Sequence, residues 1–137
     1  MTTKTKNKKG SRLSQTISKN NKSMIEIHGK SLIRHNIENI CALNEITECI
    51  VFVGHGAEEI MREVGNICNN KKIIYCIQRE QKGLIDALQS AVYYLEGDDF
   101  FMVLGDEMIV NNNYMESIQK FQKTNNLCHV GIWIGYT

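Results

Sequence analysis

A short segment of small and basic residues near the start of the sequence could bind a polyphosphate. Gly10, Ser11 and Arg12 form the segment G-S-R, and Lys22 follows later in the chain. A turn of small residues offers backbone N–H donors, while arginine and lysine side chains neutralise phosphate charge. The alternative is a solvated basic tail, in which the same residue types carry no specific function.

Two further groups of candidate residues come after apolar runs. Gln78 and Gly83 belong to QREQKGLIDA, where a carboxamide could pair with the edge of a nucleobase and a glycine would let the base approach the backbone. Asp106 follows the apolar run FFMVL, and a carboxylate there could hold Mg²⁺ beside phosphates. An ordinary surface loop and a helix N-cap are the respective alternatives.

The segment Gly54-His55-Gly56-Ala57-Glu58-Glu59 begins like a dinucleotide-binding fingerprint. Glu59 stands where that motif needs its third Gly or Ala, and no acidic partner is identified on a following strand. NAD binding is therefore not expected.

Hydrophobic patterning predicts the elements that must position these candidates. Apolar runs predict buried strands at 49–53, 73–77, 100–104 and 130–134. Apolar residues at helical spacing predict helices at about 30–43, 57–68, 84–95 and 114–121. This alternation is typical of β/α units around a mainly parallel sheet, in which ligands bind at the carboxyl ends of the strands.

Charge is distributed unevenly along the chain. The net charge is +7 over residues 1–30 and −6 over residues 31–137. A uniformly basic nucleic-acid binder is disfavoured, because the compact part of the chain would repel a phosphate backbone. The apolar runs are too short for a membrane-spanning helix, and residues 1–10 lack the apolar core of a signal peptide.

The five cysteines contain no CxxC pair, and the four histidines do not supply the paired spacing of a zinc site. Without an export signal, this pattern favours reduced thiols in the cytoplasm. The thiols are interpreted as small core side chains rather than metal ligands.

Taken in order, these segments resemble the sugar-1-phosphate nucleotidylyltransferases, and among them the glucose-1-phosphate thymidylyltransferases. G-S-R is similar to the end of the family's L-A-A-G-x-G-[ST]-R, and the stretch 22–31 is similar to K-P-x-x-P-V-x-x-K-P. V-G-H-G-A-E-E-I at 53–60 resembles V-G-Y-x-A-E-x-I, Q-x-x-x-x-G-L-x-D-A resembles the base-reading loop, and L-G-D resembles the metal-binding aspartate. The resemblance runs from Gly10 to about Phe121.

The resemblance implies a Rossmann-like three-layer α/β/α nucleotidyltransferase domain. It implies transfer of a nucleotidyl group from a nucleoside triphosphate to a sugar 1-phosphate, with release of pyrophosphate. Arg12 and Lys22 would neutralise the triphosphate during catalysis, and Asp106 would hold Mg²⁺. The nucleotide would be contacted by Gly10, Ser11, Gln78 and Gly83. A cytoplasmic protein without nucleic-acid or membrane partners is expected, and assembly into a homo-oligomer is an open alternative.

The sequence also departs from the family pattern. The three motif prolines are replaced by Ser23, Glu26 and Ser31, and TKTKNKK stands in place of the first strand and L-A-A-G. We therefore expect an incomplete domain that lacks the first strand and the C-terminal sugar-binding half. The expected organisation is a basic, disordered head at 1–21 with a remnant phosphate loop, followed by a partial nucleotidyltransferase domain at 22–137.

An incomplete domain implies an inactive isolated chain, because much of the positioning of the two substrates would be lost. The alternative function is a truncated or degenerate nucleotidyltransferase-like module without catalysis and with a binding or regulatory role.

Overall fold

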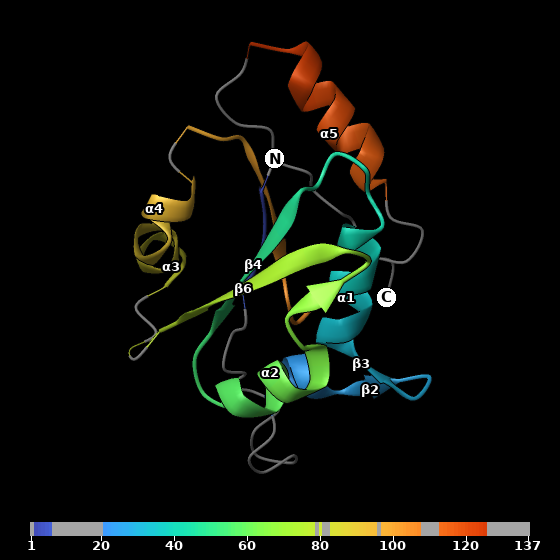
Figure 1. The fold of residues 1–137 in the computed structure, drawn as a ribbon, viewed down its shortest axis with the longest axis vertical. Coiled ribbons are helices and arrows are strands. Elements are labelled where there is room, and N and C mark those ends of the chain that lie inside the picture. The colour runs from blue at the N-terminus through green and yellow to red at the C-terminus, as the bar shows by residue number, and fades with distance from the viewer. Residues whose placement is uncertain are drawn as a thin grey trace, which may run out of the picture.

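The computed structural model describes residues 2–6, 21–78, 80, 83–95, 97–107 and 113–125, and for residues 2–6 it describes the backbone. Within these residues a twisted sheet is covered by helices on both faces (Figure 1). This is the three-layer α/β arrangement that the sequence predicts. No helix in the described part of the chain is long and apolar enough to cross a membrane.

The main sheet has five strands in the order β5-β6-β4-β1-β7. Their bounds are β1 (Thr2–Lys6), β4 (Glu48–Val53), β5 (Ile67–Cys68), β6 (Lys71–Ile77) and β7 (Phe100–Leu104). Strands β6, β4, β1 and β7 are parallel, and β5 pairs antiparallel with β6. A separate hairpin joins β2 (Glu26–Ile27) to β3 (Lys30–Ser31), after the 3₁₀ helix η1 (Lys22–Met24).

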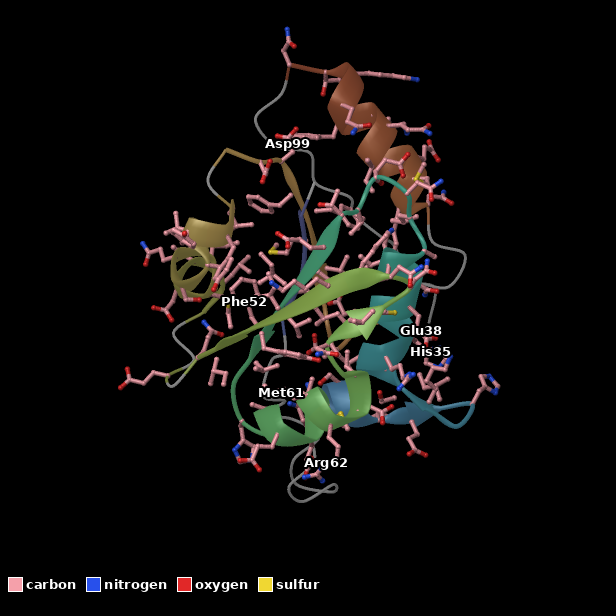
Figure 2. All side chains as sticks on the ribbon, in the orientation of Figure 1. His35, Glu38, Phe52, Met61, Arg62 and Asp99 are labelled. Carbon is pink, nitrogen blue, oxygen red and sulfur yellow. The ribbon has the colours of Figure 1, made fainter. Side chains whose placement is uncertain are left out.

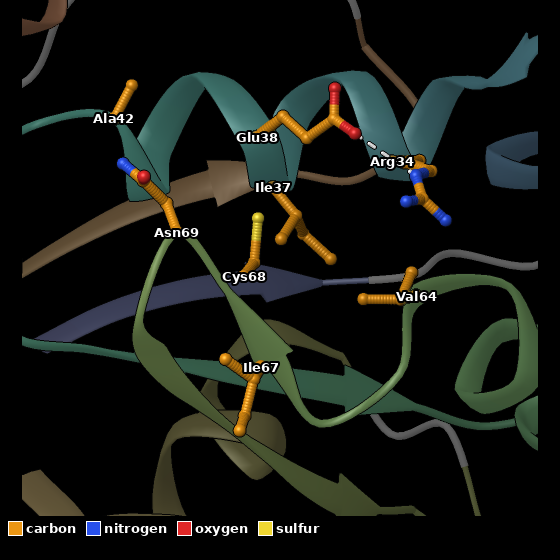
Figure 3. A pocket seen from close by; sticks show the side chains of 8 residues that line it. All are labelled: Arg34, Ile37, Glu38, Ala42, Val64, Ile67, Cys68 and Asn69. Atoms are coloured by element: carbon orange, nitrogen blue, oxygen red, sulfur yellow. Dashed lines mark hydrogen bonds and ion pairs between the residues drawn. The ribbon is translucent and has the colours of Figure 1, made fainter.

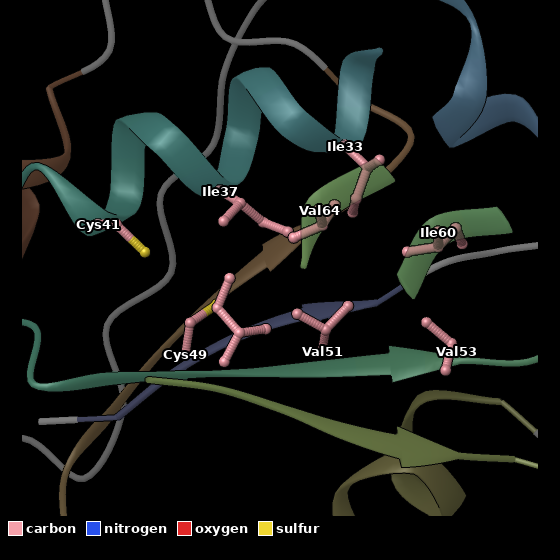
Figure 4. Packing of buried hydrophobic residues seen from close by; sticks show 9 residues of the cluster. Ile33, Ile37, Cys41, Cys49, Val51, Val53, Ile60 and Val64 are labelled. Carbon is pink, nitrogen blue, oxygen red and sulfur yellow. The ribbon is translucent and has the colours of Figure 1, made fainter. Parts of the chain in front are cut away.

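The helices are α1 (Leu32–Cys41), α2 (Ala57–Val64), α3 (Leu84–Ser90), α4 (Val92–Leu95) and α5 (Tyr114–Lys123). Strand β4 provides the contacts between the layers, because successive strand residues point to opposite faces. The residues packed toward α1 and α2 are Cys49, Val51 and Val53 (Figure 4). Ile50 and Phe52 pack instead with Ala87 of α3 and with Ala91, which follows α3. Figure 2 labels Phe52 on this face of the sheet. Burying each large apolar side chain stabilises the fold by roughly 1.5–3 kcal/mol.

The expectation that the first strand is missing is wrong. Thr2–Lys6 forms β1 inside the sheet, paired in parallel with Glu48–Phe52 of β4 and with Phe100–Leu104 of β7. Hydropathy did not reveal this strand because strand pairing uses backbone N–H and C=O groups, which threonine and lysine carry like other residues. Threonine also has a high strand propensity.

The expected disordered head at 1–21 therefore contains a central strand at residues 2–6. Asn21 is also described, whereas residues 7–20 lie outside the described part. The domain boundary at residue 21 stays a prediction.

The predicted helix at 57–68 is shorter in the structure. Helix α2 ends at Val64, and Ile67–Cys68 begins a hairpin with β6. Asn69 and Asn70 form its turn with φ angles of 50° and 62°, a left-handed pair that suits a two-residue hairpin loop. The spacing of the apolar residues is the same for one long helix and for a helix followed by a hairpin, so the sequence pattern could not separate the two.

The remaining predicted elements are close to those observed. The predicted helix at 84–95 is divided into α3 and α4 at Ala91, and β7 coincides with the predicted strand at 100–104. Phe100, expected to be buried, is 43% exposed, because β7 is the last strand on its side of the described sheet. The predicted strand at 130–134 lies outside the described residues.

Replacing Lys4 with proline tests the position of β1. Proline has no N–H, and a central strand loses a ladder hydrogen bond when it is introduced. Leaving a carbonyl oxygen of the neighbouring strand unpaired costs roughly 1–3 kcal/mol, so we expect the free energy of unfolding in urea to fall by about 2 kcal/mol or more. Lys4→Thr keeps the N–H and should stay within about 1 kcal/mol of the original chain. Equal, small effects of both substitutions would contradict this position of β1.

Candidate functional site

Four parallel strands place the segments that follow them along one edge of the sheet, here called the carboxyl edge. Gly54–Gly56 follows β4, Gln78 follows β6, and Gly105–Glu107 follows β7. Strands β4 and β1 lie between β6 and β7. At about 4.8 Å between neighbouring strands, the ends of β6 and β7 are roughly 14 Å apart. This distance is comparable to the length of an extended nucleoside triphosphate.

Lys22 is positioned at the carboxyl edge by the residue before it. The Asn21 Nδ2 donates a hydrogen bond of 3.0 Å to the carbonyl oxygen of His55, in the loop after β4. The Asn21 Oδ1 caps η1 by accepting from the Ser23 amide at 3.3 Å and from the Ser23 hydroxyl at 2.9 Å. Lys22, the first residue of η1, is thereby held beside the end of β4. Asn21 was not predicted from the sequence, although an asparagine before a short polar turn is a common cap signal.

Both serines that replace motif prolines take part in ordered contacts. Ser23 is fully buried and donates to Asn21, while Ser31 is the N-cap of α1. The Ser31 hydroxyl accepts from the Arg34 amide at 3.3 Å and donates to the Glu63 carboxylate at 3.0 Å. Hydrogen bonds at these positions restrain the backbone that a proline ring would restrain through φ.

Gln78 and Gly83 lie at the two ends of the loop between β6 and α3. The Gln78 amide donates to the carbonyl oxygen of Val53 at 2.7 Å, which fixes the backbone next to the end of β4. Its side chain is 7% exposed, and its Nε2 donates a long, 3.4 Å hydrogen bond to Asp86 in the first turn of α3. The pairing with Asp86 was not anticipated from the sequence.

Gly83 caps the N-terminus of α3 in a conformation that strongly favours glycine. Its φ is +105°, and a Cβ added there would meet no heavy atom within 4 Å. The conformation, rather than lack of space, therefore explains the glycine. Gly83 is exposed, so its backbone is accessible to a ligand at the carboxyl edge.

Asp106 lies in a turn directly after β7 and is half-buried. The side chain of Asn36, which is 1% exposed on α1, donates to carbonyl oxygens on both sides of Asp106. Burial raises the pKa of Tyr114, and the nearby negative charge of Glu107 raises that pKa further. Asn36 was missed because a single polar residue in an apolar helical stripe gives no signal of its partners.

The donor chemistry at Asp106 fits a metal ion that arrives with a nucleotide. In the described residues no three His, Cys, Asp or Glu side chains are grouped so that they could hold a metal ion. Mg²⁺ commonly takes one or two protein carboxylates and fills its other positions with water and substrate phosphates. A single carboxylate at the end of β7 meets that requirement, whereas a metal held by protein side chains alone would need more ligands.

The described structure thus brings Lys22, Gln78, Gly83 and Asp106 to the same edge of the sheet. Gly10, Ser11 and Arg12 lie outside the described residues. The described residues that flank them, Lys6 at the end of β1 and Asn21 beside His55, both lie at this carboxyl edge. Their proposed role in phosphate binding stays a prediction.

A pocket of about 500 Å³ lies away from the carboxyl edge, between α1 and the β5–β6 hairpin (Figure 3). It contains none of the predicted site residues and is lined by Arg34, Ile37, Glu38, Ala42, Val64, Ile67, Cys68 and Asn69. On its rim, the hydrogen bond from Lys30 lowers the pKa of Glu38, and Arg34 adds to this effect, although partial burial opposes it.

Comparison with known proteins identifies the family. A model described as nucleotidyl transferase matches residues 9–136. UTP--glucose-1-phosphate uridylyltransferase AglF of Haloferax volcanii is 31% identical over 112 residues, which are 82% of this chain and 45% of the relative. Glucose-1-phosphate thymidylyltransferase of Streptomyces antibioticus is 34% identical over 102 residues, covering 74% of this chain and 28% of the relative. The chain therefore spans less than half the length of these curated relatives.

The fold has solved counterparts. The crystal structure of HddC from Yersinia pseudotuberculosis, complexed with GMP-PN, superposes with a TM-score of 0.71 at 20% identity. The superposition covers 89% of this chain and 54% of the HddC chain. At this level of identity, the likeness supports the nucleotidyltransferase type of α/β fold.

Replacing Asn21 with alanine tests how Lys22 is held at the carboxyl edge. The substitution removes the cap of η1 and the bond to His55, and loss of such a cap costs about 1 kcal/mol. We expect the free energy of unfolding in urea to fall by about that amount. Asn113→Ala is the matched control, because Asn113 is the N-cap residue of α5 but makes no side-chain cap hydrogen bond. It should change stability by less than about 0.5 kcal/mol. Equal losses in the two variants would contradict a structural role for Asn21.

Proposed function

This chain belongs to the nucleotidyl transferase family, and on that premise we propose that it transfers a nucleotidyl group from a nucleoside triphosphate to a sugar 1-phosphate. Two relatives support this substrate class, since the name of each specifies glucose 1-phosphate and either a uridylyl or a thymidylyl group. Pyrophosphate is the second product of such a transfer.

The observation that carries the proposal is the set of residues along the carboxyl edge. Lys22 beside β4 supplies a cation, the loop from Gln78 to Gly83 supplies amide groups, and Asp106 after β7 supplies a carboxylate. These are the groups needed for phosphates, a nucleobase and a divalent cation, respectively. Parallel α/β sheets bind ligands at this edge.

The proposed reaction forms a bond between a phosphate oxygen of the sugar 1-phosphate and the α-phosphorus of the nucleotide. The bond from the α-phosphorus to the bridging oxygen breaks, and that oxygen leaves with pyrophosphate. The attacking oxygen belongs to a phosphate monoester, whose second pKa is about 6, so it is ionised at neutral pH. The protein consequently needs no general base, and its task is to align two anionic substrates and offset their charge.

Each proposed residue has a distinct part in that task. Arg12 and Lys22 would bind the triphosphate oxygens and neutralise charge that builds up on the leaving pyrophosphate. Gly10 and Ser11 would donate backbone N–H groups to the same phosphates. Asp106 would hold Mg²⁺, which would offset negative charge on the substrate phosphates.

The loop between β6 and α3 would select the base. Gln78 offers a donor and an acceptor, and its 3.4 Å contact with Asp86 is long enough to be exchanged for a bond to a base. Gly83 would allow the base to lie against the backbone. A cytoplasmic location fits these substrates and fits the thiols of Cys41, Cys49, Cys68 and Cys76, which form no disulfide.

Calorimetric titration with ATP, GTP, CTP, UTP and dTTP in the presence of Mg²⁺ tests the proposal, combined with an assay of pyrophosphate release with glucose 1-phosphate. We expect binding of at least one triphosphate and release of pyrophosphate that depends on the sugar phosphate, and such release would contradict the expectation, drawn from the sequence, that the isolated chain is inactive. Binding without pyrophosphate release would favour the alternative of a binding or regulatory module. Absence of binding for all five triphosphates would contradict both.

Removing Arg12 and Lys22 together should weaken triphosphate binding. Hydrogen bonds between charged groups contribute about 1.5–3 kcal/mol each, so Arg12→Ala/Lys22→Ala should lower affinity by at least tenfold and flatten its dependence on salt. Lys72→Ala/Lys123→Ala is the control. It removes the same charge at two exposed lysines, one near the amino end of β6 and one at the end of α5. Equal effects of the two double variants would show that general charge, and not a site, attracts the nucleotide.

Gly83→Ala tests the approach of the base to the backbone. Alanine is strained at a φ of +105°, and the altered loop should weaken nucleotide binding by roughly tenfold. Gly65→Ala is a matched control, because Gly65 also has a positive φ, +76°, and open space around it, but it follows α2 away from the loop. Both variants should lose similar stability in urea, and only Gly83→Ala should lose affinity. Unchanged affinity in Gly83→Ala would remove this glycine from the site.

A further inference from the structure

We propose that Asn36 is a positioning residue for Asp106, an inference that rests on the metal-binding role of Asp106 in the proposed function. Asn36 lies in the middle of α1, and the turn that contains Asp106 follows β7. The two segments are separated by about seventy residues in sequence and meet through one side-chain amide.

The contacts converge on the Nδ2 atom of Asn36. It donates to the carbonyl oxygen of Glu107 at 2.8 Å, a good hydrogen bond. It also donates two weaker hydrogen bonds, at 3.4 Å to the carbonyl oxygen of Leu104 and at 3.5 Å to that of Gly105. The bonded carbonyl groups precede and follow Asp106, so the chain has to turn around this residue.

Because this contact is buried, the carbonyl groups of the turn depend on a hydrogen-bond donor from the protein. Asn36 is 1% exposed and Gly105 is also buried, so water does not readily replace the amide. A carbonyl oxygen that loses its donor in such a place stays unpaired unless the backbone moves. Rotation of the turn would carry Asp106 with it, because this residue has no regular strand or helix of its own.

The amide itself is firmly held. Ile33, Ile37 and Ile40, on the same stripe of α1 as Asn36, are fully buried or nearly so. The amide of Leu32, the first residue of α1, also donates to the carbonyl oxygen of Ile25 at 2.9 Å, and so ties α1 to the segment after Lys22. One helix therefore supports both the proposed cation and the proposed carboxylate of the site.

Replacing a residue that only stabilises the fold would lower stability and would change metal affinity and nucleotide affinity alike. A positioning residue for Asp106 should weaken the metal specifically, since groups that orient a metal ligand commonly change metal affinity by 10–100-fold. Asn36→Leu keeps the approximate size of the side chain and removes the donor. Ile40→Val is the matched control, because Ile40 is fully buried one turn later on α1 and packs with Val103 of β7.

The experiment measures Mn²⁺ binding by electron paramagnetic resonance in the presence of a non-hydrolysable UTP analogue, and the ¹H–¹⁵N amide spectrum of the full chain without ligands. We expect Asn36→Leu to weaken Mn²⁺ affinity about tenfold or more, with nucleotide affinity in the absence of metal within twofold of the original. The amide peaks of residues 105–107 should move or broaden, while those of β4 and β6 stay in place. Ile40→Val should leave both affinities within twofold and the peaks of residues 105–107 in place.

The outcomes separate this inference from the proposed function. If Asp106→Asn weakens Mn²⁺ binding and Asn36→Leu behaves like Ile40→Val, the positioning role is overturned and the proposed function stands. If Asp106→Asn has no effect on Mn²⁺, the proposed metal site is overturned, and the inference with it. If Asn36→Leu does not fold, Asn36→Ala is measured in its place.

Discussion

The backbone pairing of Thr2–Lys6 with β4 on one side and β7 on the other holds the sheet together. Without it, β7 would have no partner among the described strands, since β1 is its neighbour in the sheet. The turn with Asp106 would then have no fixed distance from Lys22 and Gln78. A parallel sheet aligns the carboxyl ends of its strands only while hydrogen bonding is continuous across it. The proposed site therefore depends on a strand whose side chains are threonine and lysine.

Helix α1 adds a second level of support to the same edge. Its buried face packs on β4 through Ile33 and Ile37, which fixes the helix against the centre of the sheet. From that position its N-terminal end bonds to the segment after η1, and Asn36 bonds to the turn after β7. The proposed groups for phosphate and metal thus share one rigid scaffold, as catalysis by alignment requires.

The sequence predicted those parts of the fold in which side-chain pattern and backbone structure agree. The apolar runs at 49–53 and 100–104 became β4 and β7. Continuous apolar residues suit β4, which is buried almost throughout, whereas β7 is the last strand on its side of the described sheet and buries only Val103. Strand β1 could not be predicted from its side chains, since its position is set by the backbone groups of its two neighbours. The hairpin at Ile67–Cys68 was also missed, because its apolar residues fit a helical spacing as well as a strand. The left-handed turn at Asn69 and Asn70 is what makes this segment a hairpin.

Single residues of the candidate site were proposed from the sequence, whereas the partners of these residues were missed. Motif resemblance pointed to Lys22, Gln78, Gly83 and Asp106, which the fold brings to one edge. Asn21, Asn36 and Asp86 were not identified, because each acts through a long-range or loop contact that exists only in the folded chain. The central claim is that this edge binds a nucleoside triphosphate. Two-dimensional ¹H–¹⁵N spectra recorded during titration with a non-hydrolysable UTP analogue and Mg²⁺ test it most directly. The account predicts that the shifted amides cluster at residues 54–56, 78–83 and 105–107, whereas shifts confined to α5 or the β5–β6 hairpin would contradict it.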